Sequence, residues 1–472
     1  MAHIRSAVLT LIAAYLGLFI GLIDANAVNL ALPAINHDLG GGVAGGQWTI
    51  DAYNVTFASF LLTAGSLGDR FSRRRLLRIG LVTFVTASVG CGTAPSLAVL
   101  LAARAVQGVG AALMLPQGLA LAAAAFPEPR DRARVTGGWA MAAAGSTALG
   151  PLVGGALAET IGWRWIFWIN VPVGVLAIAM SVSHLPDSHD PDAQRIDLPG
   201  QVSAAVALCA GTLVLVEGHD WQWSQRVGIG ATALAATAAF VGIQRRSPHP
   251  MLPLNLFGSR RLVGALLTTF AMTFGIYGVL LVNSFALQQL RGFSALATAV
   301  WFLPMPLMYL LLIPIATTLA CRTGPRPSMA TGLMLMAAGS LLYAAAGPLG
   351  AIWQLELSFV LAGVGLALTT GPAVTLAMAA VPARRAGLAS GVVNLSRLLG
   401  ITVGVAVLGS AMTAVGGVAG VRTALLLGAS CQLAGAVVAL WLTRRPETPA
   451  RTVGPVDPVD PVDPVDKESS HA

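Results

Sequence analysis

The stretch GLIDANAVNLALP, residues 21–33, places an aspartate inside an otherwise apolar segment. Apolar residues begin near Val8, lead up to Asp24 and continue beyond it through Leu32. A helix that crosses a bilayer needs about 20 predominantly apolar residues, and this segment is long enough. An ionised carboxylate inside a bilayer is costly, so it faces a cavity or a partner and is a candidate for function. The segment therefore predicts a membrane-spanning helix that carries a functional acid.

The rest of the chain also has the composition of a membrane protein. Of its 472 residues, 56% are hydrophobic and 10% are charged, whereas a soluble globular chain has about 25% charged residues. Apolar runs predict fourteen spans, at residues 8–34, 47–69, 76–94, 97–118, 133–158, 163–184, 198–217, 225–244, 262–289, 295–320, 328–348, 353–379, 387–413 and 421–443. The sequence thus predicts an all-α membrane protein with 14 transmembrane helices.

Arginine placement predicts the orientation, because cytoplasmic joints between spans collect Lys and Arg. The joints expected inside hold Arg70, Arg73, Arg74, Arg75, Arg78, Arg130, Arg132, Arg134, Arg195, Arg245, Arg246, Arg260, Arg261, Arg322, Arg326, Arg384, Arg385, Arg444 and Arg445. The joints expected outside hold Arg164, Arg226, Arg291 and Arg422. An even number of spans with this bias predicts a multi-pass protein of the cell membrane with both termini cytoplasmic. The net charge of +8 is then mainly a topology signal and indicates no nucleic-acid partner.

Two of the basic joints are similar to each other. GSLGDRFSRRR, residues 65–75, aligns without gaps with TTLACRTGPRP, residues 317–327. The match makes spans 1–6 and 9–14 counterparts, with spans 7 and 8 as an inserted pair, and such parallel halves are one transporter design. A chance match between two basic loops is the alternative. The predicted divisions are an N-terminal six-helix bundle (1–184), the inserted pair with its linkers (185–261), a C-terminal six-helix bundle (262–443) and a disordered cytoplasmic tail (444–472).

Six motifs follow one another in the chain. They are LIDANAVNLALPAI (22–35), GSLGDRFSRRR (65–75), RAVQGVGAA (104–112), GSTALGPLVGG (145–155), GWRWIFWINVPVG (162–174) and GLASGVVNLSRLLG (387–400). In this order they resemble the 14-helix drug:proton antiporter branch of the major facilitator superfamily, over nearly all of residues 8–443. The second motif departs from the family pattern, because Ser72 replaces its second glycine.

The resemblance implies roles for two motifs. One is a cytoplasmic gating motif, formed by Gly65, Asp69, Arg70 and Arg74. The other is an antiporter motif at the interface between the halves, formed by Gly150, Pro151, Gly154 and Gly155. In the first, Asp69 is expected to close a latch near Gly387, while its arginines also serve as a topology signal. In the second, the proline is expected to kink the helix, and the following glycines admit a close neighbour.

Asp24 has a candidate partner of opposite charge. The first span runs outward and the fourth runs inward, so a rise of 1.5 Å per residue places Asp24 and Arg104 at similar depths, roughly 10–15 Å from the outer surface. Asp51 enters the second span from the same side. We therefore expect a proton site in which Arg104 serves both carboxylates. The alternatives are a static Asp24–Arg104 pair that only pins two helices, and an Asp51 that is simply hydrated.

The C-terminal half contains few ionisable groups. Between Asp220 and Glu447 the sequence has one acidic residue, Glu356, near an outer helix end. An embedded acid that binds cationic drugs from this half is therefore missing. Asn394 and Arg397 are polar residues deep in the thirteenth span. We expect Arg397 either to contact substrate or to have a structural role.

These features predict a secondary active transporter that works by alternating access. We expect it to export a lipophilic small molecule, such as an antibiotic, in exchange for protons; uptake or efflux of an endogenous metabolite is the alternative. The expected partners are this molecule, protons and the lipid bilayer, with no protein partner indicated. No nucleotide-binding loop occurs, and the cysteines lack metal or redox spacing, so we expect no cofactor and no metal. A membrane enzyme and a non-transporting sensor are remote alternatives.

Overall fold

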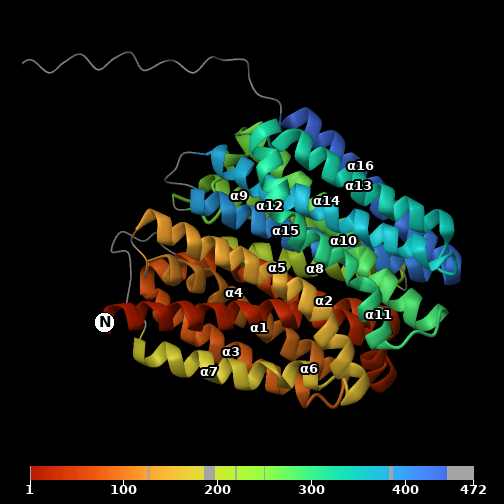
Figure 1. Cartoon of the computed structure of the whole chain (residues 1–472), viewed down its shortest axis with the longest axis horizontal. Helices are drawn as coiled ribbons and strands as arrows, with labels where there is room; N and C mark the ends of the chain where they lie inside the picture. Colours follow the sequence, from red (N-terminus) through yellow and green to blue (C-terminus); the bar gives the residue numbers. More distant parts are fainter. Residues whose placement is uncertain are drawn as a thin grey trace, which may run out of the picture.

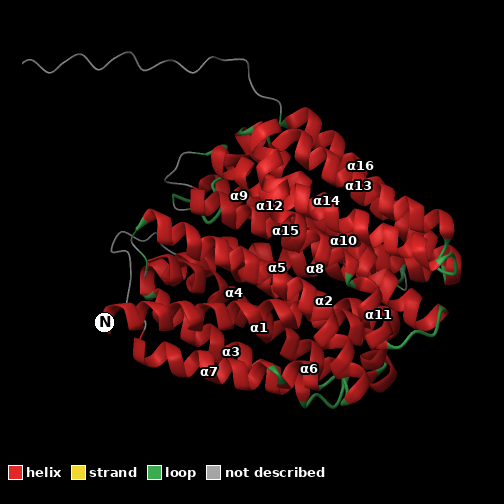
Figure 2. Ribbon diagram, viewed as in Figure 1, coloured by secondary structure: helices red, strands yellow, loops and turns green. Residues whose placement is uncertain are grey.

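The structure is a computed structural model that describes residues 2–124, 126, 128–184, 197–217, 221–248, 250–381 and 386–443. Within these ranges the surroundings of some residues, including Gly65 and Asp69, lie outside the description. All regular secondary structure in the described ranges is helical (Figure 2). The first nine helices are α1 (Ala2–Leu39), α2 (Gly42–Phe71), α3 (Arg73–Gly92), α4 (Leu97–Ala124), α5 (Pro129–Thr160), α6 (Trp165–Trp168), α7 (Asn170–His184), α8 (Leu198–Glu217) and α9 (Trp223–Arg246). They are followed by η2 (Leu254–Gly258), α10 (Arg260–Phe285), η3 (Ala286–Leu290), α11 (Ala295–Phe302), α12 (Pro304–Thr323), α13 (Pro325–Ala346), α14 (Ile352–Ala379), α15 (Ala386–Val415) and α16 (Gly417–Leu442).

Each of the fourteen predicted spans coincides with one helix or with two consecutive helices. The sixth span is divided into α6 and α7, and the tenth is divided at Leu303 into α11 and α12. Pro304 begins α12, and proline is favoured at the first position of a helix. Eleven described segments are long and apolar enough to cross a membrane. The predicted all-α class is therefore confirmed.

The helices form two groups that lie against each other. Helices α1–α7 pack among themselves, and α10–α16 pack among themselves (Figure 1). Helix α8 packs on α9 and also contacts α2 and α15, one helix from each group. Gln201 of α8 donates a 2.8 Å hydrogen bond to the carbonyl of Ser59 in α2, and Ser410 of α15 donates one of 2.8 Å to that of Leu215 in α8. The predicted domain boundaries stay predictions, and the tail 444–472 lies outside the described residues.

A close helix crossing is repeated in the two groups. A Cβ atom on Gly80 of α3 would lie 2.9 Å from the carbonyl oxygen of Gly110 in α4, and one on Gly110 would lie 3.0 Å from that of Gly80. Gly332 of α13 and Gly365 of α14 face each other in the same way, at 2.6 and 2.3 Å. Small residues allow membrane helices to approach this closely. The crossing of α3 with α4 thus has a counterpart in the crossing of α13 with α14.

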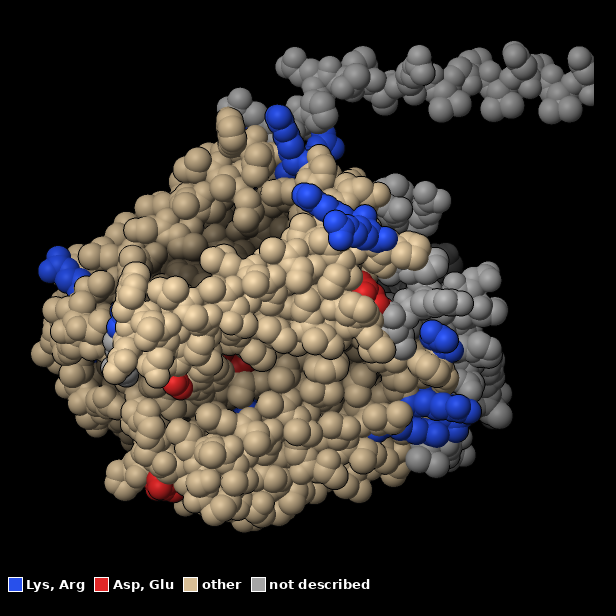
Figure 3. All heavy atoms as spheres, turned by 180° about the vertical axis from the view of Figure 1, so that it is seen from behind, with Lys and Arg blue, Asp and Glu red and all other residues tan. Residues whose placement is uncertain are grey.

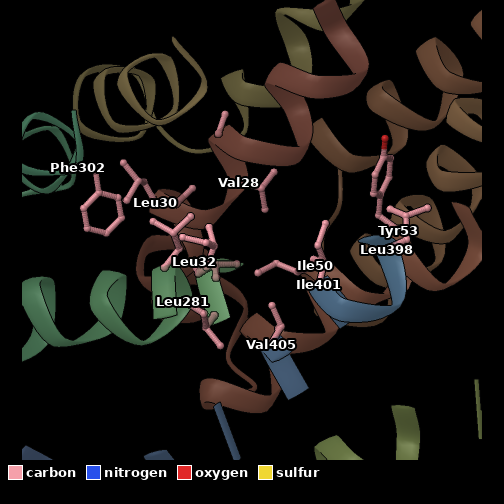
Figure 4. Packing of buried hydrophobic residues seen from close by; sticks show 14 of the residues in the cluster. Val28, Leu30, Leu32, Ile50, Tyr53, Leu281, Phe302, Leu398, Ile401 and Val405 are labelled. Atoms are coloured by element: carbon pink, nitrogen blue, oxygen red, sulfur yellow. The ribbon is translucent and has the colours of Figure 1, made fainter. Parts of the chain in front are cut away.

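The two groups are closed against each other at the end of the molecule where α1 ends and α2 begins, which we call the α1–α2 end. Ile50 of α2 lies beside Ile401 of α15 there, and both side chains are buried (Figure 4). Polar contacts reinforce the closure. They run from Gln47 Nε2 to the carbonyls of Val405 (3.1 Å) and Ala406 (2.8 Å), from Ser284 Oγ to that of Asn29 (2.9 Å), and from Gln288 Nε2 to that of Leu30 (3.2 Å).

The joint between α2 and α3 contains a strained residue. Ser72 has φ 131° and ψ 118°, and it is the only non-glycine residue with positive φ in the described part of the chain. Glycine adopts this region readily because it has no Cβ, whereas other residues are strained there, by about 1–3 kcal/mol. Ser72 Oγ accepts a 3.2 Å hydrogen bond from the amide of Arg75 and caps α3. The serine that replaces the motif's glycine therefore adds a cap but also strain.

We expect Ser72→Gly to stabilise the protein by about 1 kcal/mol, because the strain disappears while glycine at a helix N-cap costs only a few tenths of a kcal/mol. Thermal unfolding of the purified protein in detergent measures the difference. Ser72→Ala is the matched control: it keeps the Cβ and loses the cap, so it should be less stable than wild type by about 1 kcal/mol. A glycine variant less stable than wild type would contradict the assignment of strain.

Candidate functional site

Asp24 lies in the interior of the first helix group, and its charge is paired there. Its carboxylate is 0% exposed, and Arg104 of α4 is 1% exposed. The two form an ion pair between Arg104 Nη1 and Asp24 Oδ2. The structure thus brings together the two charges that the sequence placed at similar depths.

Among the described residues, every polar group that touches the Asp24 carboxylate is a hydrogen-bond donor. Besides Arg104, Gln107 Nε2 donates to Asp24 Oδ1 at 3.0 Å, and Asn170 Nδ2 donates to the same oxygen at 2.9 Å. Both amides also donate to Ser88 Oγ, at 2.8 and 3.3 Å. This geometry suits an ionised carboxylate, because a proton on Asp24 would find no acceptor among these contacts. Protonation of Asp24 therefore requires the side chains around it to rearrange.

Arg104 is held from several sides as well. Its Nε donates to the carbonyl of Thr49 at 3.0 Å, and its Nη1 donates to Gln107 Oε1 at 2.6 Å. Its Cζ lies 4.5 Å from the centre of the Tyr53 ring and 5.8 Å from that of Phe167, within the range of cation–π attraction. Helices α1, α2, α4 and α6 thus fix one guanidinium in place.

The sequence prediction missed three side chains of the hydrogen-bond network around the Asp24 carboxylate. Gln107 follows Arg104 by three residues and so shares its helix face, a signal that was available in the fourth-span motif. Asn170 was visible as a polar residue in the sixth apolar run. Ser88 gave no signal, because a serine in a membrane helix usually satisfies its own hydroxyl within the helix.

Asp51 does not join this site, contrary to the prediction that Arg104 serves both carboxylates. Thr49 and Tyr53 of α2 face Arg104, whereas Asp51 is 0% exposed and lies on the face of α2 that meets α15. Residues two apart on a helix point in nearly opposite directions, which separates these side chains. Neither Asp51 oxygen has a hydrogen-bond partner within the described ranges, and neither does the hydroxyl of its neighbour Thr402.

The gating motif is only partly described. Arg70 is exposed, with its guanidinium 5.4 Å from the centre of the Phe71 ring, and Arg74 is half-buried. The surroundings of Gly65, Asp69 and Gly387 lie outside the described part of the structure. The predicted latch between Asp69 and the thirteenth span therefore stays a prediction.

The antiporter motif lies at helix crossings on two sides of α5. A Cβ on Gly150 would lie 2.6 Å from Asn26 Cβ, and one on Gly154 would lie 2.3 Å from the carbonyl oxygen of Ala27, both in α1. A Cβ on Gly155 would lie 2.8 Å from the carbonyl oxygen of Ala295 in α11. The glycines therefore allow α5 to approach its own group on one side and the second group on the other.

The second group repeats the crossing of α5 with α1 as a crossing of α15 with α10. A Cβ on Gly400 of α15 would lie 2.6 Å from the carbonyl oxygen of Phe270 in α10, and one on Gly404 would lie 2.4 Å from that of Phe274. Pro151 follows Gly150 inside α5, whereas Ile401 follows Gly400 at the corresponding place. The two halves share this crossing, and the N-terminal half alone carries the proline.

The interior of the second group contains an uncharged cavity with a few polar side chains among mainly apolar ones. A cavity of about 20 Å³ lies between α10, α12, α13, α14 and α16, and none of its lining residues is charged. Asn283 Oδ1 and the Tyr343 hydroxyl are buried beside it and have no hydrogen-bond partner in the described part of the chain. Ser340 Oγ donates a 3.5 Å hydrogen bond to Gln432 Oε1 there. The buried ion pair of the first group thus has no charged equivalent at this cavity.

Asn394 and Arg397 lie on α15 of the second group, form none of the contacts described for Asp24, and are both half-buried. Thr273 of α10 donates a 3.0 Å hydrogen bond to the backbone carbonyl of Arg397, which fixes this part of α15 to its own group. The guanidinium Nε of Arg397 is buried without a hydrogen-bond partner among the residues that the structure describes.

Comparison with known proteins places this site in a family. The family model of the Major Facilitator Superfamily matches residues 14–405 and 305–466. The chain is 38% identical over 412 residues to the multidrug resistance protein Stp of Mycobacterium tuberculosis, covering 87% of this chain and 76% of that protein. It is 32% identical over 400 residues to a methylenomycin A resistance protein of Streptomyces coelicolor, covering 83% of each. Its fold is similar to the crystal structure of an auto-inhibited POT family peptide transporter, with a TM-score of 0.70 at 15% identity over 95% of this chain and 98% of that one. This chain therefore belongs to the Major Facilitator Superfamily.

Proposed function

We propose that this transporter exports a lipophilic small molecule, of the antibiotic or drug class, in exchange for protons and by alternating access. Export is supported by relatives that are named for resistance or efflux, among them a tetracenomycin C resistance and export protein of Streptomyces glaucescens. Proton coupling is supported by one observation above all. Asp24 is an intramembrane acid that is fully buried and surrounded by donors.

The proton acts on Asp24 by changing its bonds to α4 and α7. In the closed arrangement the carboxylate is ionised and holds Arg104 and Asn170. Protonation removes the charge that Arg104 pairs with and forces the donors to turn away, so the contacts between these helices change. Proton binding and helix packing are therefore coupled at this site.

Asp51 supplies a second acid, at the boundary between the groups. Its carboxylate lies where α2 meets α15, with the Thr402 hydroxyl as its neighbour, and neither carboxylate oxygen makes a hydrogen bond within the described residues. A buried anion without a hydrogen bond is costly, and a neutral acid is much less so. A proton on Asp51 therefore favours closure of the α1–α2 end, and loss of that proton favours opening.

We take the α1–α2 end as the outer one. Most of the Lys and Arg side chains visible in Figure 3 lie toward the opposite end of the helices. There the last turns of α2, α9 and α12 carry Arg70, Arg246 and Arg322. In Figure 1, α1 begins and α16 ends toward this same side. Because basic residues favour the cytoplasmic side, the closure described above is a closure toward the outside.

The first test concerns this orientation. A tag placed after His471 should stay unreactive toward an impermeant reagent on intact cells and react once the cells are permeabilised. A tag inserted after Gly416, in the joint between α15 and α16, is the control and should react on intact cells. If the impermeant reagent labels the C-terminal tag on intact cells, the orientation is refuted.

The second test concerns closure. A Cβ on Gly409 of α15 would lie 2.3 Å from Gln47 Nε2 of α2, so Gln47→Cys combined with Gly409→Cys places two thiols across the boundary. In a background without the four native cysteines, oxidation should stop transport and a reductant should restore it, because the outer ends must separate in each cycle. Each single variant is a control that oxidation should leave active. Full transport by the oxidised pair, with cross-linking verified, would contradict alternating access at this boundary.

The third test concerns Asp24. Asp24→Asn keeps the size of the side chain but cannot gain or lose a proton, so it should abolish accumulation driven by a pH gradient while substrate exchange without a gradient remains. The substrate is first identified with a drug-susceptibility panel in an efflux-deficient host, and transport is then measured in proteoliposomes. We expect the gradient-driven rate to fall at least about 100-fold, as for loss of an essential proton-transfer group.

Asp38→Asn is the matched control for this test. Asp38 is a carboxylate on the same helix, but it is exposed and accepts hydrogen bonds from Trp163 and Arg164 at the α1–α2 end. Its variant should accumulate substrate as wild type does. If Asp24→Asn also accumulates substrate like wild type, Asp24 only packs helices and the proton site lies elsewhere.

A further inference from the structure

The second intramembrane arginine, Arg397, differs from Arg104 in that its charge is unpaired. Arg104 contacts a carboxylate, a backbone carbonyl, an amide oxygen and an aromatic ring. Arg397 takes part in none of the ion pairs found among the described residues, and its buried Nε has no hydrogen-bond partner there. A guanidinium has five N–H donors and stays charged in proteins. Inside a membrane protein such a charge is costly unless an acceptor meets it.

Arg397 lies at the boundary between the two groups. It is close enough to Tyr53 of α2 and Tyr309 of α12 to act electrostatically on both phenols. Its chain neighbour Leu398 lies beside Tyr53 (Figure 4). Thr402, next to Asp51, belongs to the closed α1–α2 end, and Arg397 precedes it by about one and a half helical turns. Arg397 therefore lies on the cytoplasmic side of the closure.

The protein offers this guanidinium no acid among the described residues. Glu356, the only acidic residue between Asp220 and Glu447, lies near the start of α14 at the α1–α2 end. Asp51 lies beside Thr402 and also has no partner. Asp24 is already bound to Arg104. The described residues thus leave this half-buried guanidinium without a protein acceptor, so its donors are available to a bound molecule.

We propose that Arg397 binds an anionic or strongly hydrogen-bond-accepting group of the exported molecule, such as a carboxylate, phenolate or enolate, with Tyr309 beside the attached ring system. This inference rests on the proposed export function and adds the substrate class. A guanidinium can engage a carboxylate through two parallel N–H donors, which gives orientation as well as affinity. The transporter thus prefers lipophilic acids over lipophilic cations.

The test compares two dyes that share a xanthene ring system and differ in charge, the anion fluorescein and the cation rhodamine 123. Uptake of each dye into everted membrane vesicles is measured under a pH gradient, beside host tolerance to a panel of lipophilic acids and cations. Wild type should transport fluorescein and protect against the acids. Arg397→Gln should raise the KM for fluorescein by about 10–100-fold, the usual effect of losing a charge-assisted hydrogen bond. Arg397→Lys keeps the charge but lacks the paired donors, so its KM for fluorescein should lie between those of wild type and Arg397→Gln.

Arg422→Gln removes an arginine that is exposed at the start of α16 and should leave both dyes unaffected. Membrane levels of all variants are compared, so that a failure to fold is recognised. Equal transport of fluorescein by wild type and Arg397→Gln would overturn the inference. So would wild-type protection against cations, or an equal loss of both dyes in Arg397→Gln at normal membrane level, which indicates a structural role. If wild type transports neither dye and protects against no compound, the proposed export function fails and this inference fails with it.

Discussion

The Asp24–Arg104 ion pair is the constraint around which the first helix group is arranged. A bilayer offers no water to either charge, so each must be satisfied by protein, and breaking such a buried pair costs about 3–5 kcal/mol. The pair joins α1 to α4. Its remaining hydrogen bonds reach Thr49 of α2 and Asn170 of α7 directly. They reach Ser88 of α3 through the side-chain amides of Gln107 and Asn170. Five helices are positioned by one carboxylate and one guanidinium.

Helix α2 carries this constraint to the rest of the molecule, because three consecutive residues point in three directions. Gln47 contacts α15 of the second group, Trp48 Nε1 donates a 2.7 Å hydrogen bond to Glu217 of α8, and the carbonyl of Thr49 accepts from Arg104. Successive residues of a helix are rotated by about 100° about its axis, so one short segment can contact α15, α8 and Arg104 at once. Any rotation or tilt of α2 therefore changes its contacts with Arg104, with α15 across the group boundary and with α8.

The two halves share a framework but differ in their chemistry. Glycines on α5 and α15 produce equivalent crossings, as do those on α3, α4, α13 and α14. Backbone contact between small residues sets this framework, and it leaves the interior side chains free to differ. The first group encloses an ion pair, the second encloses an uncharged and mainly apolar cavity, and the boundary between them holds two ionisable side chains, Asp51 and Arg397, that form no ion pair within the described residues. This difference is consistent with the proposal that proton chemistry belongs to the N-terminal side and substrate binding to α15.

The sequence by itself determined the helices and their depths, because the thickness of the hydrocarbon layer demands about 20 apolar residues for each crossing. Depth alone brought Asp24 and Arg104 to the same level, and the gating motif marked Ser72 as the residue in a glycine position. Which way each polar side chain faces was decided only by the tertiary structure. In a helix that is apolar on nearly all sides, the hydrophobic pattern fixes no rotation, so contacts with neighbouring helices select the face. For this reason Asp51 turns to α15 instead of Arg104, and Gln107 and Asn170 meet at a carboxylate 83 and 146 residues away in the chain.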